Sequence, residues 1–200
     1  MKKRADAATI QGWCLRTGMV LLLTFGLVEL GSNVPAIWLP RKSGVVVLES
    51  KRQAQAVLAF NLHREFGVEA NLANRIVHAA RKASSATRMP VTLLLAVIAV
   101  ESEFKPVARN KGDQGLMQVN LEYHPQEARA LKNPDELIKI DTNVKVGARI
   151  LRRYLDEEAG KIYPALRRYN GVGKTNHYPE RVLKEKDRFD RLLADAGAIE

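Results

Sequence analysis

The 200-residue sequence contains a single cysteine, Cys14, which excludes an intrachain disulfide and any site built from several cysteines. Its four histidines are far apart and show no H-x-x-x-H spacing, so we expect no metal site and no cofactor. Aromatic residues make up only 6%, and alternating β-branched runs are scarce. These absences argue against a disulfide framework, a metalloenzyme and a sheet-rich fold, and they favour helices.

The composition is otherwise that of a globular protein, with 46% hydrophobic and 27% charged residues. The length suits one domain plus an additional segment. A net charge of +10 indicates attraction to an anionic partner such as nucleic acid, anionic lipid or an acidic envelope polymer. The basic residues are spread along the chain and no nucleic-acid recognition motif accompanies them, so we expect no nucleic-acid partner.

The N-terminus has the pattern of an export signal. Basic residues lie at positions 2–4, residues 18–28 are apolar and uncharged, and small residues follow at 32–36. The apolar stretch is short for a full bilayer span, which needs about 20 residues. We predict that residues 1–36 are a signal peptide or an uncleaved anchor that contacts the membrane, and that the protein is periplasmic, released or anchored to the inner membrane. The alternative is a buried N-terminal helix.

After a predicted linker over residues 37–47, we expect one domain over residues 48–200. No internal repeat or low-complexity tract interrupts it. Apolar residues at a spacing of three to four, and breaks at glycine and proline, predict its helices. The predicted helices cover residues 48–66, 69–83, 91–100, 126–132, 143–158, 161–170 and 178–195.

The helix over residues 91–100 has only one polar residue, Thr92, and a helix that is apolar on every side is buried in the middle of a domain. Glu101 follows it directly. Desolvation at such a position raises the pKa of a carboxylate, so that it can hold a proton near neutral pH and act as a general acid. Spacing alone leaves open that Glu101 is a surface residue just beyond a core helix.

Four short motifs follow one another in order. E-S-x-F-x-P-x-A lies at 101–108, G-L-M-Q at 115–118, N-x-x-x-G at 143–147 and Y-N-G at 169–171. In this order they resemble the lytic transglycosylases of the soluble-transglycosylase (SLT) family over roughly residues 88–182. The first two motifs are specific in combination, although either alone is weak.

The resemblance implies an all-α, lysozyme-like domain with a central buried helix and a substrate groove. It implies a carbon–oxygen lyase that cleaves peptidoglycan between N-acetylmuramic acid and N-acetylglucosamine and leaves 1,6-anhydro ends. Glu101 matches the single catalytic acid/base of the family, and Tyr169 is expected near it. The residues expected to contact substrate are Asn110, Met117, Gln118, Asn120 and Tyr169.

A single carboxylate suffices for an anhydro-forming reaction, because the N-acetyl group of the sugar can stabilise the oxocarbenium-like centre. A hydrolytic muramidase on the same fold would need a second carboxylate or a placed water. Glu103 is a weak candidate because residues two apart on a helix do not face each other, and Glu122 is a second candidate. A cell-wall-binding or assembly protein without turnover is the alternative outside catalysis.

The sequence departs from the family pattern at two places. Residues 109–114 lack the serine of the common turn, and Asn110 is expected to replace its hydrogen-bonding group. Val119 and Asn120 follow Gln118. This variant is similar to specialised transglycosylases that open the wall for envelope-spanning secretion or conjugation complexes. Such complexes are candidate partners. Ser102 is expected to support the helix end, and Asn143 to cap a helix.

Overall fold

The structure is a computed structural model that describes residues 43–131, 133–171 and 177–198. The chain divides into two units, Met1–Pro40 and Arg41–Glu200, and every described residue belongs to the second unit. The predicted signal or anchor over residues 1–36, and residues 37–42 of the predicted linker, lie outside the described residues.

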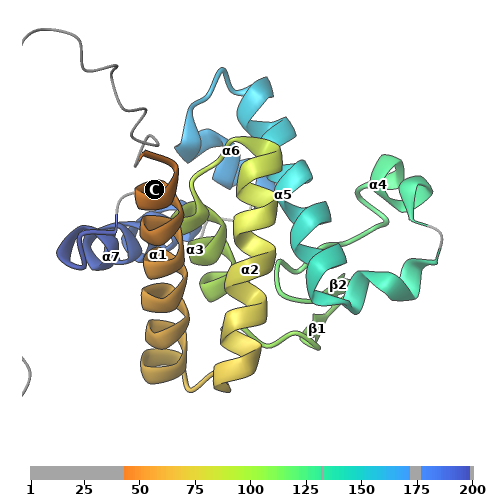
Figure 1. Cartoon of the computed structure of the whole chain (residues 1–200). Coiled ribbons are helices and arrows are strands. Elements are labelled where there is room, and N and C mark those ends of the chain that lie inside the picture. The colour runs from red at the N-terminus through yellow and green to blue at the C-terminus, as the bar shows by residue number, and fades with distance from the viewer. Residues whose placement is uncertain (1–42, 132, 172–176, 199–200) are drawn as a thin grey trace, which may run out of the picture. The chain divides into compact units, whose positions relative to one another are not determined.

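The described part of the chain is helical apart from one very short hairpin, so the expected all-α class is confirmed (Figure 1). None of its helices is both long enough and apolar enough to span a membrane. The elements in order are α1 (Ser43–Phe66), α2 (Ala70–Thr87), α3 (Val91–Ser102), β1 (Arg109–Asn110), β2 (Asp113–Gln114), α4 (Pro125–Ala130), the 3₁₀ helix η1 (Pro134–Ile138), α5 (Ile140–Glu157), α6 (Ile162–Tyr169) and α7 (Tyr178–Asp195).

The first two helices form a hairpin and lie side by side (Figure 1). Gly67 ends α1 with a φ of 65°, and the Glu69 carboxylate accepts hydrogen bonds from the backbone N–H of Asn71 and Leu72 at 2.8 Å each, which caps α2. Because α1 begins at Ser43, residues 43–47 of the predicted linker are helical. Extending a nucleated helix costs little, so weak linker signals do not stop it.

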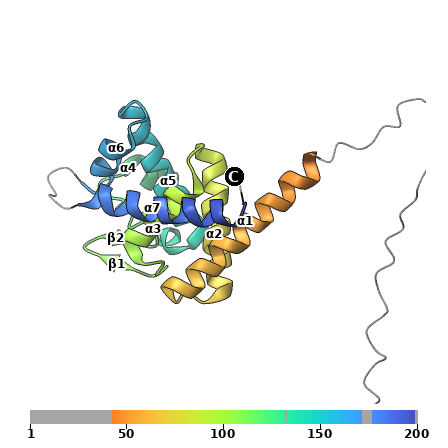
Figure 2. The ribbon, with the colours of Figure 1, turned by 90° about the vertical axis from the view of Figure 1, so that its left-hand side faces the viewer.

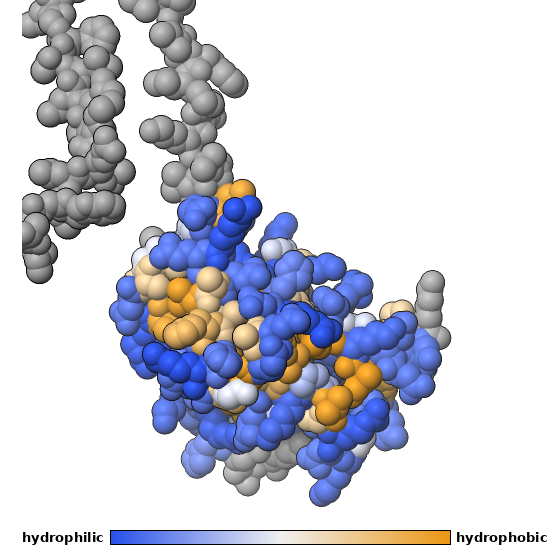
Figure 3. All heavy atoms as spheres, turned by 60° about the horizontal axis from the view of Figure 1, so that its bottom comes forward, coloured by the Kyte–Doolittle hydropathy of each residue, from blue (hydrophilic) through white to orange (hydrophobic). Residues whose placement is uncertain are grey.

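Helix α3 is the centre of the core, as predicted for an all-apolar helix. Every residue from Val91 to Ala99 is buried. It packs against α2 on one side and α7 on another, and Figure 2 shows α7 lying across it. Hydrophilic residues cover most of the face shown in Figure 3, and apolar residues gather there in separate patches.

Of two predictions about the middle of the chain, the helix expected over 126–132 is present as α4, and the helix cap at Asn143 is wrong. A 3₁₀ helix that begins at Pro134 follows α4. Proline cannot continue a preceding helix, so the two elements stay separate. Asn143 does not cap α5, because α5 begins at Ile140 and Asn143 lies inside it, fully buried.

Candidate active site

Glu101 lies in the last turn of α3 and is partly buried. The helix ends there because Glu103 and Phe104 have φ values of 50° and 63°, in the left-handed region. The Phe104 ring, 1% exposed, packs edge-on against Phe66 with ring centroids 4.7 Å apart. A buried aromatic anchor thus reverses the chain directly after the carboxylate.

The returning chain forms a hairpin over residues 109–114, where the family pattern has a turn. β1 and β2 pair antiparallel, with Asn110 opposite Asp113. Lys111 and Gly112 connect them with φ values of 48° and 94°, the two positive values that a tight two-residue hairpin turn requires. Two residues per strand are too few for a sequence pattern, so the hairpin becomes visible only in the folded chain.

Two buried polar side chains hold the G-L-M-Q segment beneath the end of α3. The Ser102 hydroxyl donates to the carbonyl of Leu116 at 2.8 Å, which confirms its expected role at the helix end. The Asn143 amide accepts from Met117 N–H at 2.8 Å and donates to the carbonyls of Gln114 and Leu137 at 2.8 and 3.0 Å. Asn143 therefore fixes the segment to α5 from inside the core.

Two motif glycines allow close approaches at this point. A Cβ atom on Gly115, whose φ is 75°, would lie 2.2 Å from the Asn143 amide nitrogen. A Cβ atom on Gly147 would lie 2.6 Å from the Met117 sulfur and 3.0 Å from the Tyr169 hydroxyl. Both distances are far inside van der Waals contact, so the motif glycines are required by packing.

Tyr178, the first residue of α7, provides the hydrogen-bond partner of Glu101. Its hydroxyl donates to Glu101 Oε1 at 2.6 Å, and its side chain is 3% exposed. Burial and the Glu101 charge raise the pKa of the Tyr178 hydroxyl well above 10, so it stays a donor throughout the physiological range. None of the motifs includes Tyr178. The only sequence signal is its place at the start of a helix beside Pro179, because the 77 residues that separate it from Glu101 are bridged by the fold.

Tyr169 also lies within the electrostatic reach of Glu101, as the motif predicts. Burial raises its pKa well above 10, and the charge of Glu101 adds to this effect, as do Tyr154 and Asp113. Its hydroxyl, however, donates to the carbonyl of Met117 at 2.9 Å. In this structure Tyr169 braces the G-L-M-Q segment, and Tyr178 orients the acid.

The remaining predicted contact residues lie on the same hairpin and loop. The Met117 side chain is fully buried, and Gln118 uses its amide nitrogen to bind the carbonyls of Ala108 and Gly115 at 3.1 and 2.8 Å. Asn110 is exposed on β1, while Asn120 is 6% exposed and accepts from the backbone N–H of the following loop at 3.0 Å. Their contacts with a substrate stay predictions.

The two weighed second acids lie at exposed positions. Glu103 forms an ion pair with Lys105 at 2.7 Å in solvent, and Glu122 is exposed on the loop after Asn120. After burial, Glu101 and Tyr154, the charge of Asp113 is the smallest of the causes that raise the pKa of Tyr169. The motifs did not single out Asp113.

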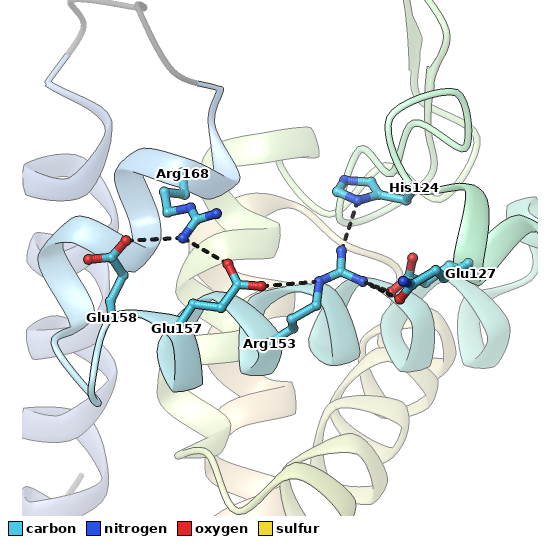
Figure 4. A network of polar contacts seen from close by, with 7 residues as sticks. His124, Glu127, Arg153, Glu157, Glu158 and Arg168 are labelled. Carbon is cyan, nitrogen blue, oxygen red and sulfur yellow. Dashed lines mark hydrogen bonds and ion pairs between the residues drawn. The ribbon is translucent and has the colours of Figure 1, made fainter.

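A chain of charged side chains joins α4, α5 and α6 beside the site (Figure 4). Arg153 contacts Glu127 at 2.6 Å, Glu157 at 4.0 Å and His124 Nδ1 at 3.2 Å. Arg168 continues it to Glu157 at 2.7 Å and to Glu158. The ring of Tyr154 lies beneath both guanidinium groups, at 5.6 and 5.0 Å. The network ties the helices that carry Tyr154 and Tyr169 to the loop before α4.

Within the described ranges, no group of three or more histidine, cysteine, aspartate or glutamate side chains could hold a metal ion. The described site contains the partly buried carboxylate of Glu101, the buried Tyr178, the partly buried Tyr169 and the backbone of the G-L-M-Q segment. These groups can donate, accept and orient protons.

Comparisons with known proteins find similarity to a protein family and to solved structures. A family model described as "Transglycosylase SLT domain" matches residues 78–189. A solved structure of an inactive mutant of the lytic transglycosylase Slt from Pseudomonas aeruginosa is similar, with 21% identity and a TM-score of 0.45. The match covers 60% of this chain and 22% of that one, so the chain spans about a fifth of that enzyme's length. No curated protein matches.

Proposed function

Because the chain belongs to the transglycosylase SLT domain family, whose model covers residues 78–189 of 200, we propose that it is a peptidoglycan lytic transglycosylase with Glu101 as its single acid/base. The family membership and the lysozyme-like fold are those expected from the motifs. The observation that carries the proposal is the 2.6 Å hydrogen bond from buried Tyr178 to Glu101, inside the matched region.

In the proposed reaction Glu101 donates its proton to the glycosidic oxygen of the leaving sugar as the C1–O bond breaks. The N-acetyl group of the muramic acid stabilises the resulting positive charge at C1. The Glu101 carboxylate then takes the proton of the 6-hydroxyl, whose oxygen bonds to C1 and closes the 1,6-anhydro ring. The nucleophile is part of the substrate and already near C1, so no water is consumed. The Tyr178 hydroxyl stabilises the carboxylate form of Glu101 between the two steps.

Glu101→Gln tests the assignment. Glutamine keeps the shape but cannot donate the proton, and general acid catalysis typically contributes about 10²–10⁴-fold. We expect loss of clearing in zymograms and of fragment release from purified sacculi. Glu103→Gln is the matched control, because Glu103 lies two residues away and is exposed. Wild-type clearing by the Glu101 variant would refute the role.

Mass spectrometry of the products separates this proposal from a hydrolytic muramidase, because anhydro and reducing ends differ by one water. Asp113 is the second carboxylate to test, because it lies half-buried on β2 of the hairpin that follows Glu101. If Glu101 is the single acid, the variants Asp113→Asn and Glu122→Gln should turn over substrate within roughly tenfold of the wild-type rate, which corresponds to about 1.4 kcal/mol of barrier. Reducing ends together with an inactive Asp113 variant would support the hydrolase.

Export completes the proposal. Residues 1–36 carry a basic start, an apolar stretch and a small-residue boundary, so we expect them to direct the enzyme to the periplasm. Fused to a reporter that is active only outside the cytoplasm, this segment should give activity, and a charge inserted at Leu22 should abolish it. Service to a secretion or conjugation complex rests on the Val119–Asn120 variant of the motif. Deleting the gene should then impair assembly of that complex without changing cell shape.

A further inference from the structure

A cavity of about 620 Å³ lies between α2, α4, η1 and α5, and Glu101 is not among the residues that line it. Within α5, Asn143 and Gly147 face the G-L-M-Q segment, whereas Thr142, Val146 and Arg149 line the cavity. At 3.6 residues per turn, the set Thr142, Val146 and Arg149 is centred about 110° around the helix axis from Asn143 and Gly147, so the two sets lie on different faces of α5. The cavity is therefore separate from the candidate active site.

The cavity has the size and floor of a ligand site. Its volume falls within the range of about 300–1,000 Å³ that is usual for small-molecule pockets. Buried Ala79, Ala83 and Val146 form an apolar part of its wall, and the small side chains of Ala86 and Ala130 line it at exposed positions. Short side chains on α2 and α4 leave this space open.

Cations line the cavity from two helices. Lys82 of α2 and Lys145 and Arg149 of α5 are all exposed, and none of them forms an ion pair with another described residue. Three unpaired cations around one cavity attract carboxylates or other anionic groups.

Carboxylates line the same cavity from α4 and from the first turn of α5. Glu127 uses Oε1 for Arg153, while its Oε2 is buried and accepts no hydrogen bond from the described part of the chain. Asp141 is exposed and has no ion-pair partner among the residues that the structure describes. The exposed carboxylate of Asp141 is accessible to a ligand, so a ligand ammonium group would be attracted to it.

We propose that this cavity binds a short peptide that carries both carboxylates and an ammonium group, the stem peptide of peptidoglycan. The class of peptide rests on the proposed function; the need for both charges rests on the cavity. A simple anion would match Lys82, Lys145 and Arg149 but not Asp141, and a simple cation would match Asp141 but not the three cations. The methyl group of an alanyl residue suits the alanine-lined floor. Such a site attaches the enzyme to peptide-bearing wall while the glycan occupies the site at Glu101.

The direct test is calorimetric titration of the full-length protein with the synthetic tripeptide L-Ala-γ-D-Glu-L-Lys. We expect saturable binding that is equal in wild type and in Glu101→Gln, because the cavity does not include Glu101. The same peptide acetylated on the lysine side chain lacks the ammonium group and should bind at least tenfold more weakly. Equal binding of both peptides, or no binding at millimolar concentration, would overturn the proposal.

Two variants locate the site. The double variant Lys145→Glu/Arg149→Glu reverses two cavity cations, and Ala86→Trp fills the space from an exposed position without changing charge. Each should weaken tripeptide binding at least tenfold. Lys184→Glu/Arg191→Glu is the matched control, because it reverses two exposed cations of α7 and changes the net charge equally. If the cavity variants bind the tripeptide with an affinity within threefold of wild type, the proposed location is wrong.

Turnover on two substrates keeps this inference distinct from the proposed function. On intact sacculi the cavity variants should be slower than wild type, and on glycan strands stripped of peptides by an amidase they should equal it. If Glu101→Gln still cleaved both substrates, the proposed function would be wrong, and the peptide titration would be unaffected. Equal slowing on both substrates would contradict the peptide site alone.

Discussion

Replacing Tyr178 by phenylalanine removes one hydroxyl from a side chain that is 3% exposed and keeps the ring in place. The lost interaction is the 2.6 Å hydrogen bond to Glu101 Oε1. Hydrogen bonds to charged groups contribute about 1.5–3 kcal/mol. Glu101 is only partly buried, so water replaces part of this contribution. We therefore expect kcat to fall about tenfold, which corresponds to about 1.4 kcal/mol of barrier.

The pH–rate profile should change in a defined direction. The Tyr178 hydroxyl stabilises the carboxylate form of Glu101 relative to its acid form, and the first step requires the acid. Without the hydroxyl, the limb of the profile where activity declines with rising pH should move to higher pH. A purely structural role of Tyr178 would lower the rate without moving this limb.

The assay is release of soluble fragments from purified sacculi between pH 4 and pH 9. Tyr163→Phe is the matched control, because the Tyr163 hydroxyl donates to the Glu180 carboxylate at 2.5 Å at an exposed position. Exposed pairs contribute little, so this variant should behave as wild type. A Tyr178→Phe enzyme with wild-type kcat and an unmoved profile would refute the role of Tyr178.

Three further predictions concern the framework of the site. Asn143→Ala leaves Met117 N–H without its partner and removes one hydrogen bond each from the carbonyls of Gln114 and Leu137. It should lower the free energy of unfolding in urea by about 3 kcal/mol; a loss below about 1 kcal/mol would contradict the clamp. Gly147→Ala places a methyl group against the Met117 sulfur and should cost about 1–3 kcal/mol despite the better helix propensity of alanine; increased thermal stability would contradict the close approach. Burial raises the pKa of Tyr169 and Tyr178 in the folded state, so stability should be complete below pH 10 and decline above it; a double phenylalanine variant should lose this slope in urea titrations at pH 8 to 11.

The sequence by itself determined the all-α class, the buried helix over 91–100 and the position of Glu101 at its end. These follow from local periodicity and composition, because a helix that is apolar on every side must be buried wherever the rest of the chain lies. The place of Gly171 directly after a helix was also predictable, because a helix stop acts within a few residues of its own position. Ser102 has one such local contact, to the carbonyl of Ile98, but its contact with Leu116 spans 14 residues.

Only the tertiary structure decided which groups meet Glu101. Tyr169 and Tyr178 are both tyrosines at helix ends, and local sequence cannot tell which hydroxyl reaches the acid; the packing of α7 across α3 gives that contact to Tyr178. The sequence around Asn143 likewise predicts a helix cap, but two of its three partners, Met117 and Gln114, lie 26 and 29 residues away. Contacts between distant segments depend on how helices pack, and periodicity carries no information about a partner that far along the chain.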